Sequence, residues 1–202
     1  MVTYHPHKTA IWRKPGTMTT PSKWLLEKIL TPRGIIPNSV LDFGAGKSHD
    51  TEIWRKLVRD VRGYDKHPFP GFEHRTQRPK GHYELVTMNY VLNVLATKKE
   101  RAEAMKDASL FVADGGHLWV STRSKSEIAK ASARGREWKR LEGGGWLTPK
   151  GTVQFGMDRE DITSLASGLL IGFTPVEVQG SPNSATGCAL FRRLGDLSPF
   201  IT

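Results

Sequence analysis

The sequence predicts an α/β sandwich with a mostly parallel sheet that ends in an antiparallel hairpin. Short apolar segments such as residues 39–43 alternate along the chain with segments of helical spacing such as 48–60. Strands that alternate with helices in this way pair in parallel within one sheet. Near the C-terminus, two expected strands at about 173–179 and 187–193 flank the turn-forming residues 180–184, which predicts the closing hairpin.

The first 23 residues are expected to form a basic, irregular arm, because they are polar and contain a Pro-Gly pair and a further proline. A helix is expected over residues 23–30, capped by Thr20 or Ser22. Pro32 and Gly34 would end this helix. Residues 24–202 then form the core of a single domain.

The next part of the chain predicts three strands. Residues 39–43 have apolar side chains that do not alternate with polar ones, which is typical of a buried strand. Apolar residues at helical spacing predict a helix over 48–60. Strands are expected at 61–65 and 83–88, and the segment 66–82, rich in Pro, Gly, His and Arg, is expected to be a loop.

The second half predicts three helices and one more strand before the hairpin. A helix is expected at 98–112, a strand at 117–122 and a basic amphipathic helix at 126–141. Asp158 is expected to cap a helix over 159–170. In the first of these helices, Ala102, Met105 and Leu110 are expected to face inward and Glu100, Arg101, Glu103 and Lys106 outward.

Length and composition indicate one soluble domain that is large enough to bury a core without cross-links. The 202 residues are enough to bury a substantial core, and no apolar run approaches the roughly 18 residues of a membrane span. The single cysteine, Cys188, excludes an internal disulfide, and we expect it in the core. The seven histidines lack metal-ligand spacing, so no metal is expected. These features fit a reducing cytoplasm.

The chain is strongly basic, with a formal net charge of +10 and a pI of about 9.9. A positive field of this size attracts polyanions, and phosphate neutralisation supplies most non-specific affinity for nucleic acid. Nucleic acid is therefore the expected partner, with DNA favoured over RNA. The alternative is a solvated basic surface that only confers solubility.

Polar residues follow three of the expected strands at their ends. Asp42 precedes the glycine turn of Gly44 and Gly46, Asp65 ends the second strand, and Asn89 ends the third. Ligands of open α/β sheets bind beyond the carboxyl ends of the strands. An acid roughly 20 residues beyond the glycines is typical of a carboxylate that accepts ribose hydroxyl protons. These residues therefore predict a nucleoside-binding crevice.

This pattern of strand-end acid, Gly-x-Gly turn and ribose acid resembles the class I S-adenosylmethionine (SAM)-dependent methyltransferases. The resemblance implies a Rossmann-like sandwich whose third strand is reduced or missing, because the gap before Tyr83 is short. It also implies SAM as cofactor and S-adenosylhomocysteine (SAH) as product. The residues that would contact the cofactor are Asp42 and the loop amides of Gly44, Ala45 and Gly46 at its amino-acid end, Asp65 at its ribose, and Lys66 and Asn89 nearby.

A narrower likeness extends from residue 7 to about residue 170. Residues 7–13 (HKTAIWR), 63–65 (GYD), 90–94 (YVLNV) and 148–155 (TPKGTVQF) are similar to segments of bacterial and phage DNA phosphorothioation-associated methyltransferases. Val153 departs from that pattern, where an aromatic residue is expected. The likeness implies a role in DNA modification.

Asn89 and Tyr90 are the catalytic candidates. They stand where methyltransferases that modify amino groups of DNA carry an acid or amide, two prolines and an aromatic residue. There the amide orients the target nitrogen and the aromatic ring stacks on a flipped base. Both prolines are absent here, so contact with the cofactor, or packing, remains the alternative role for Asn89 and Tyr90.

Six residues are expected to contact nucleic acid, although a mobile arm or a solvated helix face would explain the cations equally well: Lys8, Arg13, Arg134, Lys139, Arg140 and Gln154. Three functions stay open at this point. The first is a methyltransferase acting on nucleic acid, and the second is one acting on a small molecule or a protein. The third is a SAM-binding component of a DNA-modification system that transfers no methyl group. The target atom, the recognition sequence and the oligomeric state are not encoded in any recognisable pattern.

Overall fold

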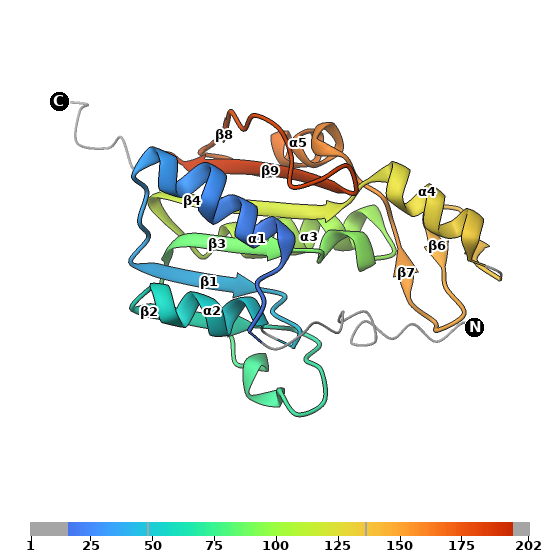
Figure 1. Cartoon of the computed structure of the whole chain (residues 1–202), viewed down its shortest axis with the longest axis horizontal. Coiled ribbons are helices and arrows are strands. Elements are labelled where there is room, and N and C mark those ends of the chain that lie inside the picture. The colour runs from blue at the N-terminus through green and yellow to red at the C-terminus, as the bar shows by residue number, and fades with distance from the viewer. Residues whose placement is uncertain (1–15, 48, 136, 196–202) are drawn as a thin grey trace.

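The computed structural model describes residues 16–47, 49–135 and 137–195 (Figure 1). Its main sheet has the strand order β2-β1-β3-β4-β9-β8. The first four strands run parallel, β9 is antiparallel to β4, and β8 is antiparallel to β9, so the expected hairpin forms. The strands are β1 (Ser39–Phe43), β2 (Asp60–Tyr64), β3 (Tyr83–Asn89), β4 (Val112–Arg123), β8 (Phe173–Val176) and β9 (Thr186–Arg193).

Helices cover both faces of this sheet. On one face lie α1 (Thr20–Trp24), its continuations η2 (Leu25–Leu30) and η3 (Thr31–Arg33), and α2 (His49–Leu57). On the other lie α3 (Lys98–Ser109) and α5 (Arg159–Ser167). Figure 1 shows α1 and α2 in front of the sheet and α3 behind it.

Successive residues of each strand enter opposite cores. Val40 packs with Trp54 of α2, whereas its neighbour Leu41 belongs to the core that contains Met105 of α3. Trp119 and Leu118 of β4 divide in the same way. Because both faces are covered, the strands need apolar residues at every position, which explains their unbroken apolar pattern. Cys188 is buried in the α1 and α2 core, as expected.

The sheet has no strand beyond β2 among the described residues. The segment between β2 and β3 contains one short 3₁₀ turn, η4 (Glu73–Thr76), so β2 is the edge of the sheet. This agrees with the expectation that the third strand is reduced or missing. No helix within the described part of the chain is both long and apolar enough to cross a bilayer.

Three expectations about helices α1 and α3 are wrong in detail. Thr19 caps α1, in place of Thr20 or Ser22, because its extended backbone (ψ 147°) lets its hydroxyl oxygen accept a bond from the Ser22 N–H at 3.3 Å. In α3, Arg101 is buried although it was expected outside, and its guanidinium lies 3.8 Å from the centre of the Phe155 ring. Leu110 is 54% exposed because α3 already ends at Ser109.

The expected basic helix over 126–141 is shorter than its pattern suggests. Helix α4 covers Lys125–Arg134 and ends at Gly135, where an added Cβ would lie 2.3 Å from the Trp138 indole nitrogen. The ring therefore packs on Gly135 and the chain turns back. Three two-residue strands follow and form a second, antiparallel sheet: β5 (Lys139–Arg140), β6 (Trp146–Leu147) and β7 (Val153–Gln154).

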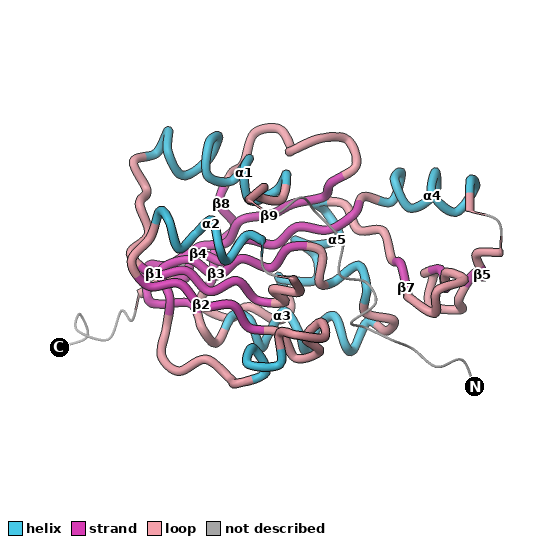
Figure 2. The backbone as a smooth tube through the Cα atoms, turned by 60° about the horizontal axis from the view of Figure 1, so that its bottom comes forward, coloured by secondary structure: helices cyan, strands magenta, loops and turns pink. Residues whose placement is uncertain are grey.

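We call residues 124–155, which comprise α4 and the second sheet, the basic excursion. It projects beyond the ends of β3 and β4 and stands apart from the main sandwich (Figures 1 and 2). The C-terminal end of the excursion is fixed beside the main sheet, because the Phe155 N–H donates to the Asn93 carbonyl oxygen at 2.7 Å. The excursion therefore overhangs the side of the domain where the parallel strands end.

Candidate functional site

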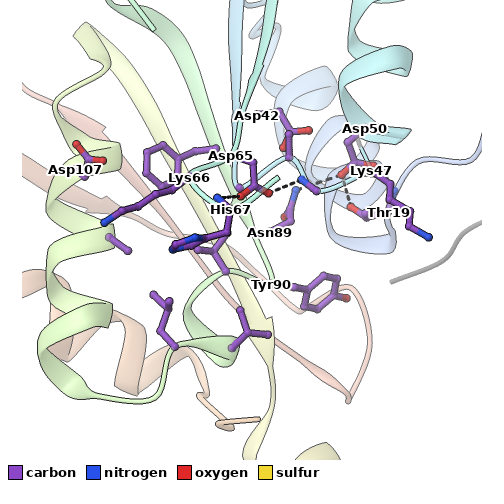
Figure 3. Close-up of a pocket in the computed structure, with 18 of the residues that line it drawn as sticks. Thr19, Asp42, Lys47, Asp50, Asp65, Lys66, His67, Asn89, Tyr90 and Asp107 are labelled. Atoms are coloured by element: carbon purple, nitrogen blue, oxygen red, sulfur yellow. Dashed lines mark hydrogen bonds between the residues drawn. The ribbon is translucent and has the colours of Figure 1, made fainter. Parts of the chain in front are cut away.

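A cavity of about 480 Å³ opens at the carboxyl ends of β1, β2 and β3. Asp42, Asp65, Asn89 and Tyr90, which the sequence nominated from three separate strand ends, all line it (Figure 3). So do Gly44, Ala45, Gly46 and Lys66. The structure thus brings the predicted cofactor-binding residues and the predicted catalytic residues together in one crevice.

The glycine turn brings the backbone close to the opposite wall of the crevice. Gly44 and Gly46 have φ of 78° and 52°, a region that favours glycine. A Cβ on Gly44 would lie 2.2 Å from Cγ2 of Val91, so no side chain fits there. The N–H groups of Gly44 and Ala45 both donate to the Tyr64 carbonyl oxygen, at 2.7 and 3.0 Å. These two amides therefore hold β1 to β2, and their predicted contact with the cofactor stays a prediction.

The N–H of Gly46 donates to Oδ2 of Asp65 at 2.8 Å. Oδ1 of Asp65 accepts a second bond, from the His67 N–H, also at 2.8 Å. Burial raises the pKa of Asp65 above its ordinary value, and these two backbone bonds partly offset that rise. Each carboxylate oxygen keeps a further lone pair, so Asp65 can accept from a ligand in the cavity.

Asp42 is almost completely buried beneath the glycine turn. Its carboxylate accepts bonds from the hydroxyls of Thr51 at 2.7 Å and Thr87 at 3.4 Å. Burial, and then the nearby charge of Asp50, raise its pKa to about 7. Asp42 is therefore an acid that changes charge near neutral pH at the wall of the crevice.

Asp50, at the start of α2, is a pocket residue that sequence reasoning missed. Its carboxylate accepts from the N–H and hydroxyl of Thr19, at 2.5 and 2.6 Å, and from the hydroxyl of Ser22 at 2.6 Å. It thereby ties the start of α1 to the start of α2 at the cavity. An acid in the first turn of the helix after the glycine loop is the sequence signal that could have found it.

Asn89 is held on all sides by hydrogen bonds. Its Oδ1 accepts from Nε1 of Trp119 at 3.1 Å and from the Ser121 hydroxyl at 2.7 Å. Its Nδ2 donates to the Ser22 hydroxyl at 2.7 Å and faces Oδ2 of Asp50 at 3.3 Å. Because the amide oxygen already has two donors, it is poorly placed to accept from a substrate nitrogen.

Tyr90 has a backbone conformation that is rare for a residue with a side chain, with φ of 59°. Its N–H donates to the Ser121 carbonyl oxygen at 2.8 Å, and its hydroxyl lies 3.5 Å from Oγ1 of Thr186. Backbone strain of this kind persists at functional sites when the surroundings hold it. Tyr90 lines the cavity from this strained position (Figure 3).

The far end of the cavity runs between the loop after β2 and helix α3. Lys66 is exposed there, opposite the acids Glu100, Glu103 and Asp107 of α3. Nη2 of Arg78 forms an ion pair with Oδ1 of Asp107 at 2.5 Å, which joins the loop to the helix. Among the residues that the structure describes, no cluster of three or more potential metal ligands occurs.

Four of the residues expected to contact nucleic acid lie in the described part of the chain, and none of these four lines the cavity: Arg134, Lys139, Arg140 and Gln154. Lys8 and Arg13 lie outside the described residues. Arg134, Lys139 and Arg140 are exposed on the basic excursion, although Lys139 and Arg140 belong to β5 and not to the expected helix. Oε1 of Gln154 accepts from Nη1 of Arg123 at 3.1 Å, which occupies that oxygen within the excursion.

Comparison with known proteins gives a consistent result. A family model described as "Methyltransferase domain" matches residues 22–175. No curated protein matches the chain. The fold is similar to that of an S-adenosylmethionine-dependent methyltransferase from Clostridium acetobutylicum, with a TM-score of 0.60, 12% identity, and coverage of 87% of this chain and 91% of that one.

Two further solved structures are similar at comparable levels. The first is 1,6-didemethyltoxoflavin-N1-methyltransferase of Burkholderia thailandensis, with bound SAH, at a TM-score of 0.59 and 15% identity over 82% of this chain and 75% of that one. The second is the N-methyltransferase NodS of Bradyrhizobium japonicum, also with SAH. Its TM-score is 0.53 and its sequence identity 17%, over 85% of this chain and 84% of that one. The expected Rossmann-like sandwich of the methyltransferase type is thereby confirmed.

Proposed function

The chain belongs to the methyltransferase domain family, and from this premise we propose that it transfers a methyl group from SAM to nucleic acid, with DNA as the favoured acceptor. Asp42, Asp65 and the glycine turn would hold the cofactor. The exposed cations of the basic excursion would hold the phosphate backbone of the acceptor. The exposed basic excursion beside the cavity is the observation that carries the choice of acceptor.

The residues around the cavity suit SAM in size and in chemistry. A volume of about 480 Å³ falls within the range of small-molecule and cofactor sites. The backbone of Gly44 packs directly against Val91 at the cavity, and two carboxylates at neighbouring strand ends suit a ribose and a cationic amino group. Two of the similar structures contain SAH, which supports the same cofactor here.

SAM supplies a methyl group that its sulfonium has already activated, so the protein contributes mainly alignment. We assign Asn89 to positioning, because its amide oxygen is engaged by Trp119 and Ser121. Tyr90 is the catalytic candidate that remains, since its ring faces the cavity from a strained backbone position. An aromatic ring in this place can stack on an acceptor base.

The basic excursion offers charges that are free to meet a polyanion. Lys130, Arg134, Lys139, Arg140 and Lys150 are all exposed, and none of these five forms an ion pair with another described residue. Counterion release on phosphate binding makes such a surface attractive to nucleic acid. The excursion lies on the side where β3 and β4 end, which is also the side of the cavity (Figures 1 and 2).

A small-molecule acceptor is the second candidate, favoured by the names of the solved relatives from Burkholderia and Bradyrhizobium. The third candidate is a SAM-binding component without transferase activity, and the same experiment tests it. That experiment also tests the role in DNA modification that the likeness to DNA phosphorothioation-associated methyltransferases implies.

The test is transfer of label from methyl-tritiated SAM, with plasmid DNA, total RNA and a metabolite extract offered in parallel. Nucleoside digests analysed by mass spectrometry identify the methylated base. The proposal expects label in DNA, reduced at least tenfold by Tyr90→Ala. Label only in RNA overturns DNA as acceptor, and label only in the extract overturns nucleic acid. SAH binding without any transfer favours the non-catalytic component.

A further inference from the structure

Arg75 is a buried arginine that belongs to none of the strands and was not expected at the site. It lies in η4, within the segment that occupies the place of a third strand, and is 5% exposed. Its Nη1 donates to the Gly46 carbonyl oxygen at 3.0 Å. The Asp65 N–H donates to the backbone carbonyl oxygen of Arg75 at 3.2 Å. Arg75 therefore contacts both cofactor-binding segments from behind the cavity wall.

The guanidinium is fixed in this position by its neighbours. The Phe72 ring lies 4.3 Å from its Cζ, and the Arg75 N–H donates to the Phe72 carbonyl oxygen at 3.0 Å. Stacking on an aromatic ring suits a planar guanidinium and leaves its N–H groups free to donate. Burial lowers the pKa of Arg75, but an arginine stays protonated throughout the working range of a protein.

This permanent charge acts on Asp42. The charged groups that influence the Asp42 carboxyl are Asp50, which raises its pKa, and Arg75, which lowers it. Thr51 and Thr87 also lower it through hydrogen bonds. In the described part of the chain, Arg75 is the cation that offsets the burial of Asp42. The attraction is mutual, because Asp42 is the largest favourable influence on the charged form of Arg75.

We propose that Arg75 is a positioning residue for the cofactor, which favours the ionised form of Asp42 and holds the Gly46 carbonyl in the glycine turn. This inference rests on the proposed function, because it assigns Asp42 to the amino-acid end of SAM. A deprotonated Asp42 attracts a cationic amino group, whereas a protonated one does not. Arg75 would thus set the pH range in which the cofactor binds.

Two substitutions separate the charge of Arg75 from its hydrogen bond. Arg75→Gln keeps an N–H donor for Gly46 but loses the charge, and Arg75→Lys keeps the charge. Arg62→Met is the matched control, because Arg62 also contacts this segment, through Nη2 to Gln77 at 3.0 Å, but does not line the cavity. The dissociation constant of SAH is measured by calorimetry from pH 5.5 to 8.5. The Asp42 carboxyl carbon is titrated by NMR in the ligand-free protein.

The proposal expects Arg75→Gln to move both midpoints to higher pH by roughly one unit, since removal of a neighbouring cation disfavours the ionised form of a carboxyl. At pH 6.5 its SAH affinity would fall about tenfold, and near pH 8.5 it would approach the wild type. Arg75→Lys and Arg62→Met would keep the wild-type midpoint.

A loss of affinity by a constant factor at every pH would overturn the proposal and make Arg75 a purely structural residue. Failure of both Arg75 variants to fold, while Arg62→Met folds, would lead to the same conclusion. If the wild type binds no SAH at all, the proposed cofactor fails. The ligand-free titration of Asp42 still tests the coupling to Arg75 in that case.

Discussion

Oδ2 of Asp65 accepts a hydrogen bond from the backbone N–H of Gly46 across 2.8 Å. The two residues follow different strands, β1 and β2, and are 19 positions apart in the sequence. The contact joins the glycine turn to the acid expected to bind a ribose, so the two motifs form one wall of the cavity. Any ligand that spans this wall contacts both motifs, so substitutions in either motif should change the affinity for that ligand.

Replacement of Asp65 by alanine should weaken SAH binding by about 10- to 100-fold, because a hydrogen bond to a charged group contributes roughly 1.5–3 kcal/mol. Calorimetric titration of the purified variant measures this loss. Asp114→Ala is the matched control, since Asp114 is a partly exposed acid of β4 that pairs with Arg193. Equal affinity of the wild type and the Asp65 variant would remove Asp65 from the cofactor site.

Substitution of Asp42 by asparagine should abolish a pH dependence of cofactor affinity. With the pKa of Asp42 raised to about 7, SAH affinity of the wild type should rise between pH 5.5 and 7.5 as this acid ionises. The asparagine side chain carries no charge at any pH, so the SAH affinity of the variant should stay low and constant over that interval. Parallel curves for the two proteins would contradict the assignment of Asp42.

The same acid should also make folding stability depend on pH. Its folded-state pKa of about 7 lies above its ordinary value of 3.8, so between these values the folded state holds more protons than the unfolded one. The free energy of unfolding should therefore fall as pH rises from about 4 to 7, by on the order of a few kcal/mol. Urea denaturation at both ends of this range should show a smaller fall for Asp42→Asn.

Loss of the Asn89 side chain should act mainly on stability. Asn89→Ala leaves Nε1 of Trp119 and the Ser121 hydroxyl without their present acceptor, and an unsatisfied buried group costs about 1–3 kcal/mol. Thermal denaturation should show a clear fall in Tm. Val91→Ala, at a half-buried neighbour that lines the same cavity, serves as the comparison. An unchanged Tm together with lost transfer would restore Asn89 as a catalytic residue.

Tyr90 should act through its ring and not through its hydroxyl. The hydroxyl has only a long contact, at 3.5 Å from Thr186, so Tyr90→Phe should keep most of the methyl transfer. Tyr90→Ala should lower kcat by tenfold or more, with a modest change in SAH affinity. Steady-state kinetics with the acceptor that the labelling experiment identifies distinguish the two variants. A Phe variant as inactive as the Ala variant would assign the hydroxyl a chemical role.

Charge reversal on the basic excursion should weaken DNA binding and its salt dependence. Each phosphate contact contributes about 0.9 to the slope of log K against log salt, so Lys139→Glu with Arg140→Glu should reduce the slope by roughly 2. Lys28→Glu with Lys56→Glu reverses two exposed cations of η2 and α2 and should leave the slope nearly unchanged. Equal effects of the two double variants would indicate a response to net charge alone.

The strand positions and the composition of the crevice followed from sequence because they depend on local pattern. An apolar run without alternation marked β1, and the acids or amide at the ends of β1, β2 and β3 placed Asp42, Asp65 and Asn89 at one edge of a parallel sheet. What the pattern could not show is which groups satisfy one another. The Gly44 amide donates to Tyr64, a partner set by strand pairing at long range.

Long-range packing also explains the other differences. Helical spacing continues past Gly135, but the Trp138 ring occupies the space that a continuing helix would need. The helical pattern predicts Arg101 at the surface, but its guanidinium packs on the ring of Phe155, which is far away in the sequence. Arg75 lies in a segment without periodicity, and only the three-dimensional path of that segment reveals its contact with Gly46.

The most direct test of the crevice is backbone NMR of the ¹⁵N-labelled protein during titration with SAH. Binding across the three strand ends should shift the amide signals of Gly46, Asp65 and Tyr90 together, and the shifts should saturate with one dissociation constant. The signals of Leu110 and Ile171, which line a second cavity, should not shift. Shifts that cluster at the second cavity, or no shifts at millimolar SAH, would contradict a cofactor site at the glycine turn.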